Sequence, residues 1–337
     1  MDLIGIALFF LGISFILLTV IDIFQTVIQI GGGGVMSKFF SEHLWKFFVW
    51  IAGGDPQSKI LAYAGGFILA SLFFFWIILL WAGFSLIYLS EEAAVVDTNS
   101  GRMVSTVGKI YYVGYTLTSL GNGDLKSGSD AWRLMSNFMG ITSMFIVTLS
   151  ISYLLPVLQA ALSKRVLAKY INQMGDNPQE ILIKGWNGKD FSLLYNRMRT
   201  LDAMILKHTE NHLAYPILHY FHAERREFSA PLNLAKLDEA LTCIQIFELD
   251  PSATRYNWQF LRKSLDDFVE MAKRSYVQPE KEAPPFHIDL LASSFPQIEK
   301  LNEGLPVIQS DLNERRKLLL GLVQKDCWKW TDVYRTK

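Results

Sequence analysis

The sequence is short of the features that mark an enzyme or a nucleic-acid-binding protein. Its 337 residues carry 32 basic and 32 acidic side chains, so the net charge is zero, and no basic arm is present. The two cysteines, Cys243 and Cys327, are too far apart to suggest a disulfide framework or a metal-binding spacing. No Gly-x-Ser-x-Gly, phosphate-binding loop or His-Glu-x-x-His motif occurs. The sequence therefore predicts no catalysis, no cofactor and no nucleic-acid partner.

Charge is also absent from three long apolar runs, Leu3–Ile21, Ile60–Ser90 and Leu134–Ser163. About 20 apolar residues suffice for a helix to cross a bilayer. The first run lacks the positive start and cleavage site of a signal peptide, so residues 1–30 are expected to remain as a membrane helix. The three runs predict an all-α membrane protein with three spans in a lipid bilayer.

Asp22 lies near the end of the first apolar run. An ionisable residue inside a span is a candidate for a functional role. Because Asp22 is close to the boundary, we interpret it as reaching interfacial water, with a functional role as the alternative.

Residues 31–58 are predicted to form an interfacial amphipathic helix and a linker. After the flexible break Gly31–Gly34, the segment Val35–Ile51 has charged residues on a different helical face from its apolar ones. The apolar residues at helical spacing are Met36, Phe40, Leu44, Phe47 and Ile51. A helix of this kind lies in the membrane interface. It either couples cytoplasmic movement to the next span or serves only as an anchor.

The central feature of the chain lies between the second and third apolar runs. It is the stretch Thr118-Ser119-Leu120-Gly121-Asn122-Gly123-Asp124, preceded by a short helix predicted over residues 107–117. Non-helical backbone at membrane depth must be buried in protein or line a water-filled path. Its carbonyl oxygens are suited to replacing the water around a cation.

This stretch resembles the selectivity filter of potassium channels, usually written T-T-V-G-Y-G-D. Four positions agree, namely Thr118, Gly121, Gly123 and Asp124. Ser119 replaces a threonine, Leu120 a valine, and Asn122 the aromatic residue between the glycines. Tyr111 and Tyr112 match the aromatic pair of the family's pore helix. The resemblance covers roughly Lys59 to Ala161.

The resemblance implies a pore domain over residues 59–165. Its parts are an outer helix at 60–90, a pore helix at 107–117, the filter at 118–124 and an inner helix at 131–165. It also implies K⁺ as the permeant ion, coordinated by the carbonyls of Ser119 to Asn122. A ring of carbonyls from one pore loop per chain requires several chains, so a homotetramer is expected.

Asn122 is the main departure from the family. It is shorter than the aromatic residue that braces the family's filter against the pore helix, so we expect it not to reach as far. This puts selectivity for potassium over sodium in question. The alternative is an ordinary Asn-Gly turn in a membrane-anchored signalling or scaffold protein whose pore-like segment does not conduct. The apolar, helical flanks argue against that turn.

Two residues of the inner helix are gating candidates. Gly140 provides a bending point, and Pro156 removes a backbone donor near the inner end, where a kink is expected. A packing role is the alternative for Gly140.

The flanking charges predict the orientation in the plasma membrane. Lys38, Lys46 and Lys59 lie before the outer helix, and Lys164, Arg165 and Lys169 follow the apolar run of the inner helix. Positive charge favours the cytoplasmic side, so the C-terminal domain is expected there and the N-terminus outside.

Residues 166–337 are predicted to form a mostly helical cytoplasmic domain. Helices are expected over residues 189–214, 231–249, about 250–277 and 312–333, with a linker at 279–285. No strand followed by Gly-x-Gly-x-x-Gly is found, which argues against a nucleotide-binding gating domain. A regulatory ligand is not identifiable from the sequence.

The domain contains a histidine series, His208, His212, His219 and His222. Helical spacing would place the four imidazoles on one face, although Pro216 interrupts the helix. The i, i+4 pair His208 and His212 has the spacing of metal ligands and is a candidate metal or pH-sensing site. Packing or surface histidines, and a membrane-bound metalloenzyme, are the alternatives.

Overall fold

The computed structural model describes residues 2–246, 249, 258–285 and 310–335. The chain divides into two compact units. Unit 1 comprises residues 1–44 and 66–157, and unit 2 comprises residues 45–65 and 158–337. The boundaries differ from the expected ones at 59 and 166, because the end of the interfacial helix and the start of the outer helix pack with the C-terminal residues.

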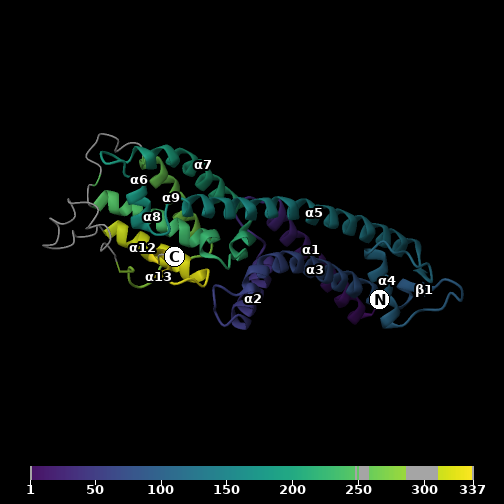
Figure 1. Ribbon diagram of the computed structural model, residues 1–337. Coiled ribbons are helices and arrows are strands. Elements are labelled where there is room, and N and C mark those ends of the chain that lie inside the picture. Colours follow the sequence, from purple (N-terminus) through teal and green to yellow (C-terminus); the bar gives the residue numbers. More distant parts are fainter. Residues whose placement is uncertain (1, 247–248, 250–257, 286–309, 336–337) are drawn as a thin grey trace. The chain divides into compact units, whose positions relative to one another are not determined.

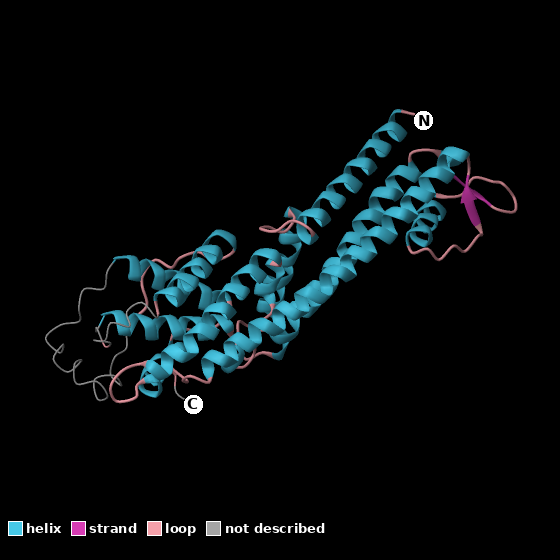
Figure 2. Ribbon diagram, turned by 90° about the horizontal axis from the view of Figure 1, so that it is seen from above, coloured by secondary structure: helices cyan, strands magenta, loops and turns pink. Residues whose placement is uncertain are grey.

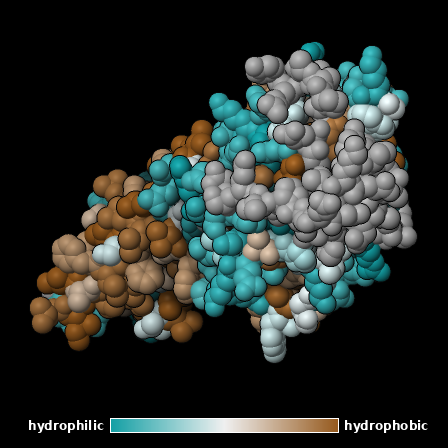
Figure 3. Space-filling model, turned by 90° about the vertical axis from the view of Figure 1, so that its left-hand side faces the viewer, coloured by the Kyte–Doolittle hydropathy of each residue, from teal (hydrophilic) through white to brown (hydrophobic). Residues whose placement is uncertain are grey.

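Three helices are long and apolar enough to cross a membrane: α1 (Leu3–Val27), α3 (Lys59–Leu89) and α5 (Asp130–Asn172) (Figure 1). Many of their large apolar side chains are exposed, among them Leu3, Phe74 and Met144. Figure 3 shows such hydrophobic side chains gathered on one part of the visible surface. The all-α membrane class is confirmed. The inner helix is longer than predicted and continues to Asn172.

α1 packs closely along α3 through glycines. A Cβ atom added to Gly12 would lie 2.6 Å from the carbonyl oxygen of Gly83, and one added to Gly5 would lie 2.3 Å from that of Ser90. Small residues let helix backbones approach in a membrane, where dispersion contacts drive association. The N-terminal span is thereby fixed against the outer helix over most of its length.

Asp22 is buried in unit 1 and does not reach solvent, so the interfacial-water interpretation is wrong. Its carboxylate accepts hydrogen bonds from the backbone N–H groups of Met36 (2.8 Å) and Ser37, from the Ser37 hydroxyl, and from the Trp76 indole (3.3 Å). The N–H groups belong to the first turn of α2 (Val35–Ile51), where a negative charge satisfies otherwise unpaired donors. Asp22 therefore joins α1, α2 and α3.

The burial pattern of α2 differs from the predicted separation of apolar and charged faces. Its buried positions include the small polar residues Ser37 and Ser41, whereas Val35, Phe39 and Trp50 are exposed. Ser37 is turned inward because its backbone N–H and hydroxyl donate to Asp22. The exposed side is mixed, since Lys38 and Lys46 are exposed together with these apolar residues.

The loop before the pore helix contains a strand that the sequence pattern does not predict. Strand β1 (Val95–Asp97), preceded by the 3-10 turn Glu92–Ala94, pairs antiparallel with β2 (Leu125–Ser127), with Val96 opposite Lys126. Between them lies the pore helix α4 (Thr106–Leu117), whose N-terminus is capped by Ser105. The small sheet thus joins the two ends of the segment that carries the pore helix and filter motif.

Unit 2 is a helical assembly around α8 (Ala230–Ile246), in which residues 230–244 are all buried. Its other helices are α6 (Pro178–Gly185), α7 (Ser192–Ala214), α9 (Gln259–Ser275), α12 (Ser310–Lys325) and α13 (Thr331–Tyr334), with 3-10 turns at Pro216–Tyr220 and Arg226–Phe228 (Figures 1 and 2). The core is apolar, and includes Leu201, Leu241 and Phe268.

Several helix limits differ from the prediction. The last predicted helix is two helices, because residues after Lys325 turn and Cys327 adopts a positive φ of 63°. The described part of α9 begins at Gln259, and the start predicted at Asp250 lies outside the described residues. The expected helix over 189–214 begins at Ser192, because Asn187 and Asp190 form a turn before it.

Candidate ion-conducting filter

The pore helix α4 is held firmly against both neighbouring spans. The Trp81 indole on α3 donates to the carbonyl of Ile110 at 2.9 Å, and the Ser143 hydroxyl on α5 donates to the carbonyl of Leu117. The second contact satisfies a carbonyl in the last turn of the helix, which has no helical partner. The start of residues 118–124, called the pore segment below, is therefore fixed by α5.

The backbone of the pore segment reverses the sign of φ at every second residue. Ser119, Gly121 and Gly123 have φ values of 56°, 58° and 76°. In an ordinary extended strand successive carbonyls point to opposite sides, so a regular change of φ sign is needed to turn them to one side. Glycine tolerates positive φ without a steric penalty. Both glycines of the motif are thus required by the backbone, and Ser119 is a non-glycine exception.

Asn122 donates a hydrogen bond from its amide nitrogen to the hydroxyl of Tyr111 on the pore helix. The expectation that this side chain is too short to reach the helix is therefore wrong. Tyr111 extends far enough to meet the amide, so the tyrosine supplies the length that asparagine lacks. The Tyr111 ring is itself set edge-on against Tyr115, with ring centroids 5.1 Å apart.

Behind the pore segment lies a hydroxyl cluster formed by Tyr88, Tyr112, Ser127 and Ser136. The Tyr112 hydroxyl lies 2.8 Å from the hydroxyl of Ser127 and 2.7 Å from that of Ser136. Tyr88 lies 2.8 Å from Ser136 through its own hydroxyl. The cluster joins α3, α4, β2 and α5 through neutral groups.

Tyr115 provides another contact at the far end of the pore segment. Its hydroxyl donates to the carbonyl of Leu125 at 2.8 Å, just after Asp124. Tyr111 and Tyr112 were identified from the motif, whereas Tyr115, Ser127, Ser136 and Ser143 were missed. The i, i+4 relation of Tyr111 and Tyr115 was a usable signal. The three serines had no such sequence signal, because their hydrogen-bonding partners come from other helices and strands.

The two gating candidates lie in α5 with different surroundings. No atom lies within 4 Å of a Cβ added to Gly140, so the structure gives no packing reason for this glycine within one chain. Pro156 lies inside α5, which is one uninterrupted helix, and the division between the units falls directly after it at Val157. Both roles in gating stay predictions.

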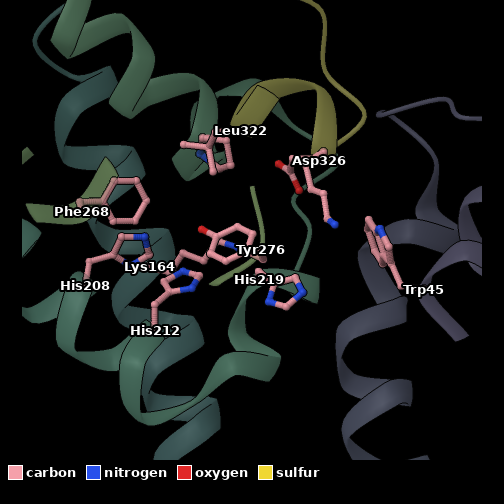
Figure 4. Close-up of a pocket in the computed structure, with 11 residues that line it drawn as sticks. Trp45, Lys164, His208, His212, His219, Phe268, Tyr276, Leu322 and Asp326 are labelled. Atoms are coloured by element: carbon pink, nitrogen blue, oxygen red, sulfur yellow. The ribbon is translucent and has the colours of Figure 1, made fainter. Parts of the chain in front are cut away.

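The histidine series does not lie on one helix. α7 ends at Ala214, and Pro216 opens a 3-10 turn that carries His219. His208 and His212 remain together, with ring centroids 4.6 Å apart, and pack on Phe268 and Tyr276 (Figure 4).

Both rings of this pair are buried and neutral. Burial lowers the pKa of His208 to about 3, with a further contribution from the charge of Lys164. Neither ring nitrogen of His212 has a hydrogen-bond partner among the described residues. The adjoining cavity of about 20 Å³ has room for about one water. Within the described residues, no group of three or more His, Cys, Asp or Glu side chains is arranged to hold a metal ion. The metal role stays a prediction.

The described structure has the parts of a pore-loop membrane protein. These parts are three apolar spans, a short helix that ends between two of them, and a glycine-rich segment braced by tyrosines. The family model described as "Ion channel" matches residues 70–160, which include most of α3, all of α4 and the pore segment, and α5 as far as Ala160.

A membrane protein of Bacillus subtilis (strain 168), "Uncharacterized membrane protein YdjJ", is 31% identical over 333 residues, covering 95% of this chain and 94% of that protein. The chain belongs to this family of membrane proteins with an ion-channel pore domain. No solved structure matches the chain.

Proposed function

We propose that this ion channel conducts potassium through a filter formed by Thr118–Asp124 from four copies of the chain. The observation that carries the proposal is the hydrogen bond from Asn122 to Tyr111. A filter selects K⁺ over Na⁺ by the number and placement of its carbonyls. Selectivity therefore needs a support that stops the backbone from collapsing onto the smaller ion.

Two further observations support a filter of fixed width. The alternating φ signs at Ser119, Gly121 and Gly123 match a segment that turns its carbonyls to one side. The contacts of Ser143 with Leu117 and of Tyr115 with Leu125 hold both ends of the pore segment. One chain supplies one side of a ring, so closure requires a symmetric assembly.

We also propose that unit 2 lies in the cytoplasm and regulates the pore. The basic residues Lys164, Arg165 and Lys169 at the end of α5 favour that side of the plasma membrane. Residues 45–65, which join α2 to α3, pack within unit 2. A Cβ atom added to Gly65 on α3 would lie 2.8 Å from Phe221. A movement in unit 2 would thus act on the start of the outer helix.

The test is flux of K⁺, Na⁺ and N-methyl-glucamine through purified protein in liposomes. We expect K⁺ flux to exceed Na⁺ flux, and Tyr111→Phe to lower this ratio by up to about tenfold, since one neutral hydrogen bond is worth roughly 0.5–1.5 kcal/mol. Tyr63→Phe is the matched control, because Tyr63 is an exposed phenol on α3. Asn122→Tyr, which places an aromatic between the glycines, is expected to retain or raise the ratio.

Equal K⁺ and Na⁺ flux in the wild type would indicate a non-selective cation pore. Absence of flux under any gradient or pH would favour a signalling or scaffold protein with a pore-like segment. If Tyr111→Phe leaves the ratio of K⁺ to Na⁺ flux unchanged, the Asn122–Tyr111 hydrogen bond does not contribute to selectivity.

A further inference from the structure

His222 occupies an unusual position in unit 2, between a loop at the membrane helices and the C-terminal end of the chain. Its side chain is fully buried. The Nε2 atom lies 2.7 Å from the carbonyl oxygen of Pro56, in the loop between α2 and α3. The Nδ1 atom lies 2.9 Å from a carboxylate oxygen of Asp326, directly after α12.

Both neighbours of the imidazole are acceptors. A backbone carbonyl has no proton to give, and an ionised carboxylate has none either. A neutral imidazole donates from one nitrogen only, so its second nitrogen would face an oxygen lone pair. Only the doubly protonated ring donates to Pro56 and Asp326 at the same time. The geometry therefore fits the imidazolium form.

We propose that His222 is a proton-binding site whose proton holds the α2–α3 loop against the C-terminal end of unit 2. The contact formed by Pro56, His222 and Asp326 is called the His222 clasp. Loss of the proton removes one of its two hydrogen bonds. The clasp should therefore be closed at acidic pH and should open as the pH rises. A consequence for flux rests on the proposed regulation of the pore by unit 2.

The charged groups around the ring favour this state on balance. Asp326 accepts a second bond from the Ser229 hydroxyl at 3.1 Å, which fixes its carboxylate. Lys164 on α5 opposes protonation, but its ammonium is bound to the carbonyls of Leu218 and Phe221 at 3.2 and 2.9 Å. The other faces of the ring meet the indoles of Trp45 and Trp328. Lys325, His219 and Asp326 line the adjoining cavity, in which Figure 4 labels His219 and Asp326.

The pKa of His222 agrees with the geometry. Burial alone lowers this pKa, but the charge of Asp326 and the hydrogen bonds to Asp326 and Pro56 outweigh burial and Lys164, so the pKa is raised above its ordinary value. A group whose pKa is raised by folding stabilises the closed clasp fully below its ordinary pKa of 6.5. That stabilisation is lost as the pH rises through the raised value.

Neighbouring contacts place the clasp where it would affect the membrane helices. Trp45 on α2 packs against Tyr220 and His222, with ring centroids 5.9 and 6.3 Å away. Gly65 near the start of α3 lies against Phe221. Residues 220–222 thus contact the end of α2, the loop and the start of α3, all within unit 2.

The first experiment is hydrogen–deuterium exchange of residues 53–58 in the full-length protein in lipid nanodiscs at pH 6 and pH 9. The reference is His222→Arg, because arginine keeps a positive charge and several donors at both pH values. Intrinsic amide exchange accelerates with pH equally in both proteins, so dividing the wild-type exchange rate by that of His222→Arg at each pH removes this effect. We expect a ratio near 1 at pH 6 and about 10 or more at pH 9, the effect of losing one charge-assisted hydrogen bond. In His222→Gln, residues 53–58 should exchange faster than in the wild type at pH 6. The control is His43→Gln, which changes an exposed histidine of α2 and should leave the exchange of residues 53–58 at the wild-type rate.

Exchange of the buried helix α8 in the same samples shows whether a variant is folded. Asp326→Asn provides a second test, because it should move the opening of residues 53–58 to lower pH while α8 stays protected. Equal exchange of wild type and His222→Arg at pH 9, or full protection in His222→Gln at pH 6, would overturn the proposal.

Flux in liposomes at the same two pH values separates this proposal from the proposed function. A pH-dependent flux in the wild type that is lost in His222→Arg links the clasp to conduction. A protein that never conducts but still opens residues 53–58 at pH 9 would contradict the channel function and leave the clasp intact. Conduction with no difference between wild type and His222→Arg in exchange would contradict the clasp alone.

Discussion

In unit 1 the polar groups behind the pore segment are neutral hydroxyls, whereas the central helix of unit 2 carries buried ion pairs. Tyr88, Tyr112, Ser127 and Ser136 hold the pore region with no charge involved. On α8, by contrast, Asp238 pairs with Arg262 at 2.7 Å and Glu239 with Arg316 at 2.6 Å, all of them largely buried.

The difference follows from the surroundings expected for each unit. A charge inside a bilayer is costly, and neutral hydroxyls supply directional contacts without that cost. On the central helix of unit 2, Asp238 and Glu239 are buried ions, and each lies beside an arginine of opposite charge. We therefore expect changes in unit 1 to alter conduction with small losses of stability, and changes at the α8 ions to alter stability first.

The largest effect is expected for Gly121→Ala. Gly121 has a φ of 58°, which an alanine disfavours, so the carbonyls of the pore segment would no longer turn to one side. We expect ion flux to fall to background in liposomes, with the thermal unfolding of unit 2 unchanged.

Gly66→Ala is the control for this prediction, since no atom lies within 4 Å of a Cβ there and its φ is not positive. If the Gly121→Ala variant conducts ions as fast as the wild type, the pore segment is not the filter.

The next largest effect is expected for Arg316→Met in unit 2. Removing Arg316 leaves Glu239 buried without its charge partner, and a broken buried pair costs about 3–5 kcal/mol of unfolding free energy. The measurement is thermal or denaturant unfolding of the full-length protein.

Arg274→Met breaks an exposed pair with Glu270 and should cost no more than about 1 kcal/mol. Replacing Glu239 by Gln together with Arg316→Met should recover part of the loss. If Arg316→Met and Arg274→Met lower the unfolding free energy by similar amounts, the buried ion pairs of α8 do not determine the stability of unit 2.

The smallest effect is expected for Tyr112→Phe in the hydroxyl cluster. The phenol is bonded to Ser127 and Ser136, and these serines also lie 2.8 Å from each other, so they keep a partner when it is removed. We expect a loss of about 1 kcal/mol in stability and a measurable change in the K⁺ to Na⁺ flux ratio. A stability loss as large as that of Arg316→Met would mean that neutral and ionic clusters are equally costly to break.

The membrane spans and the position of the pore segment were predictable from the sequence, because both depend on local pattern. Absence of charge over Leu3–Ile21 is enough to predict a span, and the glycine spacing at Gly121 and Gly123 needs only positions two residues apart. The ion-channel family model matches residues 70–160, which include most of the second span and much of the third.

Other features had no signal along the chain. The position of Asp22 near the end of an apolar run predicts contact with interfacial water, whereas Asp22 caps the N-terminal turn of α2, 14 residues away. Asn122 was judged too short because the length of Tyr111 was not considered. The strand pairing of Val95 with Ser127 joins residues on either side of the pore helix, in segments too short to predict.

Hydropathy and glycine conformation act on neighbouring residues, so the local pattern of the chain is enough to show where it enters apolar surroundings and where its backbone must leave the helical form. Which polar groups meet depends on how the helices pack. Glu239 and Arg316 are 77 residues apart, and His222 and Pro56 are 166 apart. A buried charge is stable only beside its partner, and that partner is chosen by how helices pack.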